Sequence, residues 1–120
     1  MIVAGFGCRA GATAASLRAA LVVASEDHGA TMLAIPVDRL AIARPLADAL
    51  DLPLVGIAAD ALAATITPTR SPASLAARGT GSVAEAAALA GAGPGARLLR
   101  PRHIATDRTA TCAIAQRTPS

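Results

Sequence analysis

The first candidate for a functional site is a glycine-rich stretch near the N-terminus, Gly5-Phe6-Gly7-Cys8-Arg9-Ala10-Gly11. This stretch follows a short apolar run at residues 1–4, which predicts a buried strand, and precedes a helical pattern at residues 12–24. Glycines permit a sharp turn and let a ligand come close to the backbone. A helix start offers unpaired N–H groups, and Arg9 adds positive charge, so the stretch predicts an anion site. A tight turn without a ligand accounts for the same residues equally well.

A second stretch of this kind, G-T-G-S-V-A-E, runs from Gly79 to Glu85. Ser82 and Glu85 match the S-x-x-E capping box, which predicts a helix beginning at Val83 and explains both residues without a ligand. If both glycine-rich turns lie at the carboxyl ends of strands, they face one crevice, where α/β sheets usually bind ligands. The predicted ligand-binding residues are therefore Gly5, Gly7, Cys8, Arg9, Gly79, Thr80, Gly81, Ser82 and Arg108.

Three side chains are candidates for catalysis, namely Cys8, Glu85 and Asp107. Cys8 lies next to Arg9 and close to a predicted helix start, an environment that lowers the pKa of a thiol and favours a nucleophile. The sequence identifies no general base beside it, so a structural cysteine is the favoured interpretation. Glu85 and Asp107 also have structural interpretations that need no catalysis. Glu85 can serve as a helix-capping residue, and Asp107 can lie in a solvated turn.

The composition restricts the function classes that are open to the chain. Its 120 residues predict a single domain, and they include one phenylalanine, no tyrosine and no tryptophan. Such a chain lacks the aromatic platform on which single-stranded nucleic-acid binding usually relies, and the absence of lysine excludes catalysis through a lysine Schiff base. Two cysteines without a Cys/His spacing predict no metal site, and no cofactor is expected. Because the sequence has neither a signal-peptide pattern nor a transmembrane pattern, we expect a cytoplasmic protein.

The positive charge is concentrated toward the C-terminus. Residues 97–120 contain five arginines against one aspartate, a local charge of +4, so that the remainder carries −1 of the total of +3. A basic segment suits phosphate or carboxylate partners, and the arginine fork can pair both oxygens of a carboxylate.

An α/β fold must position these residues. Strand patterns at residues 1–4, 31–37, 52–57, 98–101 and 109–115 alternate with helix patterns at 12–24, 45–51, 60–64, 71–77 and 83–90. Pro45 is expected to begin its helix, since proline fits the first turn. The alternation predicts a three-layer α/β/α sandwich with a mostly parallel or mixed central sheet of about five strands, the last two forming a hairpin. Residues 116–120 are expected to fray.

The first glycine-rich stretch also fits the dinucleotide-binding fingerprint formally, as Gly5-x-Gly7-x-x-Ala10. No acidic residue stands clearly at the end of the second predicted strand, and the chain is too short for two mononucleotide-binding halves. A small nucleotide-binding module is therefore the weakest functional hypothesis.

Four sequence blocks together resemble one protein family. They are G-F-G-C-R at 5–9, T-P-T-R-S-P at 67–72, G-T-G-S-V-A-E-A-A-A-L at 79–89 and A-T-C-A-I-A at 110–115. In this order and spacing they resemble the cobalamin-biosynthesis family of CobE and the C-terminal domain of CbiG. Arg39 departs from the family pattern, in which a lysine often follows the aspartate, here Asp38. The arginine keeps the positive charge at this position but cannot fill a role that requires an amine.

The resemblance implies an α/β/α domain that acts in building the corrin ring and binds a precorrin or corrinoid intermediate as a carrier or helper. Other enzymes of the cobalamin pathway are a further implied class of partner, whereas nucleic acid and membranes are not expected. CbiG-like proteins open a lactone ring on a cobalt-precorrin with loss of acetaldehyde. A lactone hydrolase is therefore the alternative, with Cys8 as nucleophile and Glu85 or Asp107 as general base.

Overall fold

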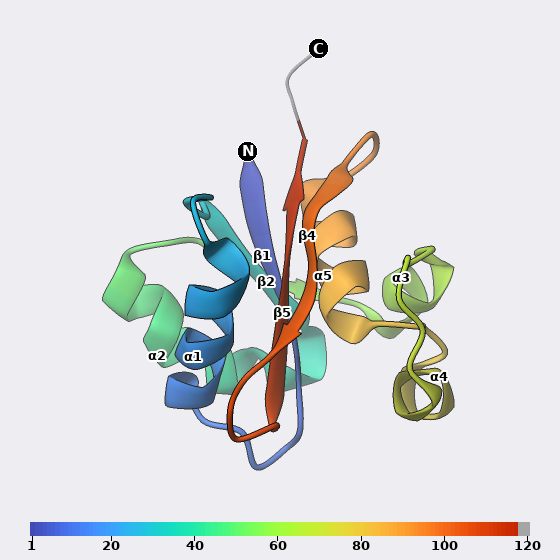
Figure 1. The fold of residues 1–120 in the computed structure, drawn as a ribbon, viewed down its shortest axis with the longest axis horizontal. Coiled ribbons are helices and arrows are strands. Elements are labelled where there is room, and N and C mark those ends of the chain that lie inside the picture. The colour runs from blue at the N-terminus through green and yellow to red at the C-terminus, as the bar shows by residue number, and fades with distance from the viewer. Residues whose placement is uncertain (118–120) are drawn as a thin grey trace.

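A mixed sheet of five strands forms the centre of the molecule. The structure is a computed structural model that describes residues 1–117, apart from the side chains of Ala73 and Ala77. Its strands are β1 (Ile2–Cys8), β2 (Met32–Pro36), β3 (Leu54–Ile57), β4 (Arg97–Ile104) and β5 (Ala110–Gln116), in the order β3-β2-β1-β5-β4. β1, β2 and β3 run parallel, and β5 runs antiparallel to both of its neighbours. The predicted α/β class, the mixed sheet and the C-terminal hairpin are confirmed (Figure 1).

Helices cover both faces of the sheet, which confirms the three layers. α1 (Ala14–Ser25) and α2 (Leu40–Leu50) lie on one face, and α5 (Val83–Ala92) lies on the other. α3 (Ala59–Ala64) packs on α5, and α4 (Pro72–Arg78) packs on α3, so these two short helices stand to the side of the sheet (Figure 1). A single 3-10 turn, η1 (Val37–Arg39), leads from β2 into α2. No helix in residues 1–117 combines the length and the hydrophobicity needed to cross a bilayer.

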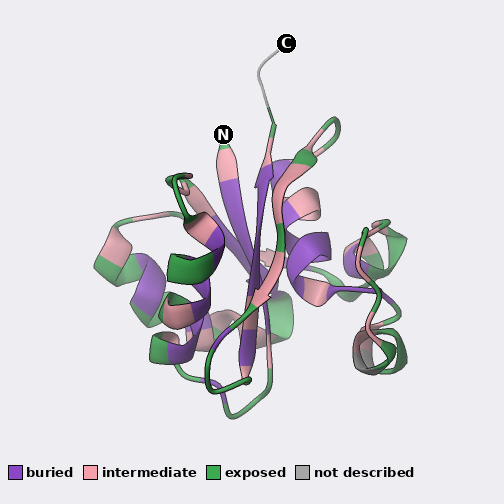
Figure 2. Ribbon diagram, in the orientation of Figure 1, coloured by how far each residue is buried: buried purple, intermediate pink, exposed green. Residues whose placement is uncertain are grey.

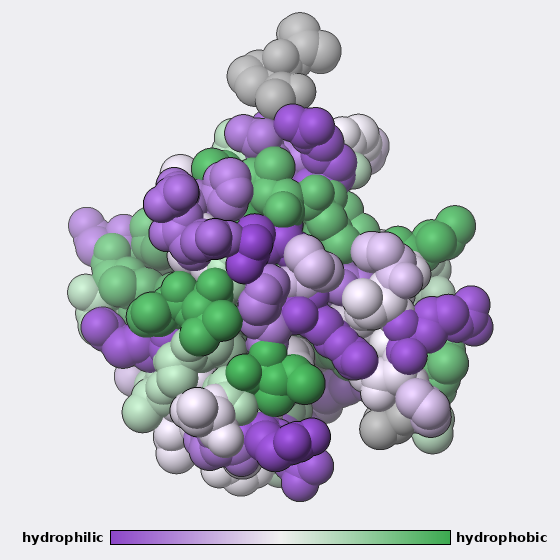
Figure 3. All heavy atoms as spheres, viewed as in Figure 1, coloured by the Kyte–Doolittle hydropathy of each residue, from purple (hydrophilic) through white to green (hydrophobic). Residues whose placement is uncertain are grey.

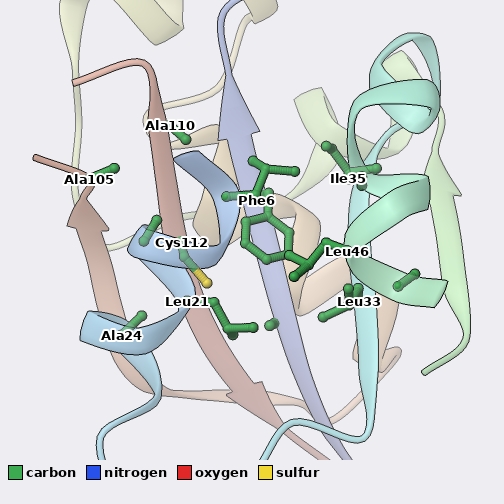
Figure 4. Packing of buried hydrophobic residues seen from close by; sticks show 14 of the residues in the cluster. Phe6, Leu21, Ala24, Leu33, Ile35, Leu46, Ala105, Ala110 and Cys112 are labelled. Atoms are coloured by element: carbon green, nitrogen blue, oxygen red, sulfur yellow. The ribbon is translucent and has the colours of Figure 1, made fainter. Parts of the chain in front are cut away.

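The face under α1 and α2 holds the larger apolar side chains. Phe6 of β1 is fully buried there, with Leu33 and Ile35 of β2 and Leu46 of α2 around its ring (Figure 4). Residues that alternate along a strand share one face, so the sequence pattern of β1 and β2 directs these side chains together. Burying each of them stabilises the fold by about 1.5–3 kcal/mol. The central strands are accordingly buried, whereas α3 and α4 are largely exposed or intermediate (Figure 2).

The face under α5 is built from small residues, and it corrects the prediction for the first strand. β1 does not end at Ala4 but continues through Gly5 and Gly7 to its last residue, Cys8. A Cβ at Gly5 would lie 2.2 Å from the backbone nitrogen of Ala88 and 2.4 Å from a second backbone atom of α5. Only glycine allows the helix to approach the strand so closely, since any side chain would strike backbone. This glycine therefore serves helix packing and not a turn.

Two helix boundaries also differ from the predictions. α1 begins at residue 14, two residues later than expected, because the Thr13 hydroxyl accepts the Ser16 N–H at 3.2 Å and forms the N-cap. α2 begins at Leu40, so the prediction that Pro45 starts this helix is wrong. Proline inside a helix leaves the carbonyl four residues earlier, that of Ala41, without its donor. Both positions are exposed, so water can supply the missing hydrogen bond.

β4 is longer than predicted because it tolerates a proline. Pro101 lies where the register between β4 and β5 shifts, and β4 is an edge strand of the sheet. Proline is accepted at sheet edges and bulges, where its missing N–H is not needed in the ladder. Of the tail predicted to fray, Gln116 is the last residue of β5, and residues 118–120 lie outside the described part of the chain.

The hydrophobic side chains that stay exposed are scattered. On the face shown in Figure 3, hydrophobic and hydrophilic residues are interspersed, and no single apolar surface extends across it. Such scattered exposure is normal for the surface of a folded domain.

Candidate functional site

A cleft of about 640 Å³ opens at the carboxyl ends of β1 and β2. Its walls come from residues 7–10 at the end of β1 and just beyond it, from Arg39 in η1, from α4 and the residue before it, and from the end of β4. Residues 108–111, which lead into β5 and begin it, and Val83, the first residue of α5, complete the lining. In the view of Figure 1 the β4–β5 turn and the loop that follows β1 overlap at the lower end of the molecule, and α4 lies to their right. This end of an α/β sheet is the usual place for a ligand.

Five arginines line this cleft, and each comes from a different part of the fold. They are Arg9 after β1, Arg39 in η1, Arg78 at the end of α4, Arg102 in β4 and Arg108 in the β4–β5 turn. Among the described residues, no acidic side chain lines the cleft, and none forms an ion pair with Arg9, Arg102 or Arg108. The cleft therefore presents a strongly positive surface to a ligand.

One carboxylate, that of Asp38, is paired with the cleft arginines from outside the lining. Arg78 donates to both oxygens of Asp38 at 3.0 and 3.2 Å, and Arg39 lies 3.7 Å away. The hydrogen bond from Arg78 holds the pKa of Asp38 below its usual range. Asp38 therefore stays ionised at neutral pH and partly compensates two of the five guanidinium groups.

Cys8 lies in the cleft, but its environment differs from the one predicted. Burial raises the pKa of its thiol, and the nearby Arg39 and Arg78 only partly oppose this effect. The expectation of a lowered pKa is wrong because α1 starts six residues further on, so its positive end is not at the sulfur. The thiol is therefore protonated at neutral pH.

Glu85 has a structural role that the capping-box pattern did not reveal. Its backbone N–H donates to the Ser82 hydroxyl at 3.3 Å, as predicted, but its own carboxylate does not return to Ser82. Instead one carboxylate oxygen accepts the N–H of Thr69 at 3.0 Å, and the other accepts the N–H of Arg102 at 2.9 Å. The side chain is fully buried and does not line the cleft. Glu85 thus fastens β4 and the segment before α4 to the start of α5.

The Asp107 carboxylate likewise accepts hydrogen bonds from neighbouring residues. It accepts a short hydrogen bond from the Ser16 hydroxyl of α1, and its other oxygen accepts from the N–H and the hydroxyl of Thr109. These hydrogen bonds lower the pKa of Asp107, that from Ser16 most strongly. The carboxylate attaches the β4–β5 turn to α1. The next residue, Arg108, has a left-handed φ of 63°.

Residues 79–82 of the second glycine-rich stretch support the cleft without lining it, whereas Val83 of the same stretch is a lining residue. Gly79 ends α4 with a left-handed φ of 69°. A Cβ at Gly81 would lie 2.6 Å from the carbonyl oxygen of Thr69, so this glycine allows two segments to pack closely. Thr80 and Ser82 are buried, and within the described residues none of positions 79–82 belongs to the lining.

The structure brings together part of the predicted site and adds to it. Of the predicted ligand-binding residues, Gly7, Cys8, Arg9 and Arg108 line the cleft, whereas Gly5 lies under α5. The position of Arg39 in the sequence could have indicated that it belongs to the site, because it follows a predicted strand as Arg9 does. The lining residues that were not among the predicted site residues lie around α4, in β4, at the start of β5 and at single positions elsewhere: Ser71, Ser74, Arg78, Arg102, Ile104, Thr109, Ala110, Thr111, Ala10, Arg39 and Val83. In residues 1–117, no three His, Cys, Asp or Glu side chains are grouped closely enough to hold a metal ion.

Comparisons with known proteins identify the family. A family model described as Cobalamin synthesis G C-terminus matches residues 2–115. No protein in the curated collection of characterised sequences matches the chain significantly.

Solved structures agree with this match. The crystal structure of CobE, a protein from the cobalamin (vitamin B12) biosynthetic pathway, is 34% identical, with a TM-score of 0.85 over 100% of this chain and 92% of that one. The cobalamin biosynthesis protein chiG from Agrobacterium tumefaciens str. C58 is 36% identical, with a TM-score of 0.74 over 99% and 100% of the two chains. A cobalamin biosynthesis protein G homolog from Sulfolobus solfataricus shares the fold at 18% identity, with a TM-score of 0.73 over 95% of this chain and 36% of that one. Because the family model spans almost the whole chain, and two solved relatives share about a third of its residues over nearly their full length, this chain belongs to the CobE and CbiG C-terminal family of cobalamin biosynthesis proteins.

Proposed function

We propose that the cleft binds a precorrin or corrinoid intermediate through the carboxylates of its side chains, and that the protein acts as a carrier or helper in the pathway. The observation that carries this proposal is the convergence of five arginines on one cleft whose described lining contains no acid. The family supports the ligand class, because corrin precursors bear many acetate and propionate side chains.

The chemistry of arginine suits such a ligand. A guanidinium group is planar and pairs with both oxygens of a carboxylate, and it remains charged at any physiological pH. Arginines on separate segments of the chain are suited to carboxylates spread around the rim of a macrocycle. The volume of about 640 Å³ lies within the usual range of small-molecule sites. Val83 and Ile104 add apolar surface for the ring itself.

A lactone hydrolase is the second candidate, and one observation favours it: Cys8 is one of the residues that line the cleft. Burial raises the pKa of that thiol, which disfavours the thiolate that attack requires. Glu85 and Asp107 are engaged in hydrogen bonds outside the lining. These placements support binding more strongly than catalysis by the three residues.

A titration tests the binding proposal directly. The absorbance of a corrin polycarboxylate is followed as protein is added, and a saturable spectral change is expected with wild type. Replacing Arg9, Arg102 and Arg108 together by glutamine is expected to weaken binding by about one hundredfold, at roughly 1 kcal/mol for each partly exposed ion pair.

Two controls separate a specific site from general attraction. Arg18→Gln combined with Arg44→Gln removes positive charge from exposed positions of α1 and α2 outside the cleft, and this variant should bind within about threefold of wild type. A corrinoid whose carboxylates have been converted to amides should bind weakly to all variants. Absence of saturable binding, or equal losses in the cleft and control variants, would contradict the proposal.

A further inference from the structure

We infer that Asp38 occupies the carboxylate position of Arg78 in the unliganded protein, and that a ligand carboxylate exchanges with it there. Asp38 would then set the affinity and the selectivity of the cleft for polycarboxylates. The inference rests on the proposed function of the cleft.

The Asp38–Arg78 pair has the geometry of a bound ligand carboxylate. Two terminal nitrogens of Arg78 donate to the two oxygens of Asp38 at 3.0 and 3.2 Å, which is the bidentate arrangement. Arg78 lines the cleft and Asp38 does not, so the aspartate reaches into the arginine set from outside. The same carboxylate lies 3.7 Å from Arg39, a second lining residue.

The exposure of the two partners indicates which of them can leave. The Asp38 side chain is 54% exposed, whereas that of Arg78 is only 19% exposed. An exposed carboxylate can return to water at little cost, because water replaces its hydrogen bonds and the net strength of exposed ion pairs is small. Arg78 would stay in place and present the same two N–H groups to the incoming carboxylate.

The pair also joins two parts of the fold. Asp38 belongs to η1 at the end of β2, and Arg78 is the last residue of α4, which stands beside the sheet and packs on α3 (Figure 1). The same ion pair would also be present if the role of Asp38 were only structural, as a strut that holds α4 in place. The two roles are separable, because removal of the carboxylate strengthens ligand binding if Asp38 is a competitor and weakens it if Asp38 is a strut.

The Asp38→Asn variant, titrated with the same corrin polycarboxylate at low salt, provides the test. We expect about three- to tenfold tighter binding, since a neutral amide pairs with Arg78 more weakly than a carboxylate does and leaves its two N–H groups free for a ligand carboxylate. Asp48→Asn makes the same charge change at an exposed position of α2 outside the cleft, and it should alter affinity by less than about twofold.

A double-mutant cycle shows whether Asp38 acts through Arg78. Arg78→Gln should weaken binding, and adding Asp38→Asn to it should restore little affinity. Thermal melts of each variant report whether it is folded. Weaker or unchanged binding by Asp38→Asn overturns the inference, as does a gain that persists at full size beside Arg78→Gln. If wild type itself shows no saturable binding, the proposed function fails and this inference falls with it. If wild type binds and only the gain is missing, this inference alone fails.

Discussion

Cys8 is the residue whose chemistry separates a carrier from a hydrolase. Burial raises the pKa of its thiol, so at pH 7 the native protein should be alkylated by iodoacetamide more slowly than a small free thiol, and the rate should rise as the pH increases. Cys112 is fully buried, and burial raises the pKa of its thiol as well, so the labelling reports on Cys8. The Cys8→Ala variant should retain its affinity for the corrin polycarboxylate within about twofold. Rapid alkylation at pH 7, or lactone hydrolysis that disappears in Cys8→Ala, would favour a nucleophile instead.

Glu85 is predicted to matter for stability and, through stability, for the cleft. Glu85→Gln replaces one accepting oxygen with an NH₂ group that cannot accept the N–H of Thr69 or Arg102, which should lower the free energy of unfolding by about 1–3 kcal/mol. Urea denaturation measures this change. Ser82→Ala is the matched comparison, because it removes only the helix cap and should cost about 1 kcal/mol. An unchanged midpoint for Glu85→Gln would show that the carboxylate does not hold these segments.

At the scale of elements, the packing of α5 on β1 makes a sharp prediction. Gly5→Ala would place a methyl group 2.2 Å from backbone nitrogen in α5, so strand and helix must separate, at a cost of about 3 kcal/mol or more. Gly11→Ala has no atom within 4 Å of the added Cβ and should leave stability unchanged or raise it by about 0.4–1 kcal/mol. Chemical denaturation of the two variants makes the comparison. Similar stabilities would mean that α5 does not approach β1 as closely as described.

The same packing explains which elements could be predicted from sequence. Helix starts that depend on local chemistry, such as Ser71-Pro72 and Ser82, were predicted correctly, and so was the C-terminal hairpin. Gly5 could not be interpreted in this way, because a glycine that turns a chain and a glycine that admits a helix look alike in sequence. Its actual partner is a helix some eighty residues further along the chain. The S-x-x-E pattern at Ser82 predicts the helix start but not the role of the Glu85 carboxylate, since the hydrogen-bond partners of that carboxylate lie in other segments.

At the scale of the whole molecule, the uneven charge predicts how the proposed binding depends on salt. A cleft lined by five arginines should lose affinity for a polycarboxylate as salt increases, by about tenfold or more between roughly 50 and 500 mM NaCl, because screening shortens the range of charge interactions. The absorbance titration repeated at several salt concentrations measures this dependence. The Arg9, Arg102 and Arg108 triple glutamine variant should show a clearly shallower dependence. An equal dependence of affinity on salt for wild type and the triple variant would mean that the charges responsible for binding lie elsewhere.

The location of that charge was only partly predictable. The basic C-terminal region indicated an anionic partner, and two of its arginines, Arg102 and Arg108, do line the cleft. The remaining lining arginines follow β1 and β2 or end α4; strand order places the ends of β1 and β2 side by side, and packing of α4 on α3 positions Arg78. Strand order depends on long-range packing, so periodicity along the chain cannot provide it.

The isolation of Phe6 has a practical consequence for every variant proposed above. It is the sole aromatic ring among phenylalanine, tyrosine and tryptophan, and it is enclosed beside Leu33 and Leu46 on the face of the sheet under α1 and α2 (Figure 4). Its ring current must shift the NMR signals of those leucine methyl groups, and no second such ring can produce the same pattern. A one-dimensional proton spectrum therefore reports the integrity of this layer without a label. The cleft variants can thus be separated from misfolded protein by a few upfield methyl resonances, while a corrin chromophore is followed without tryptophan or tyrosine absorption beneath it.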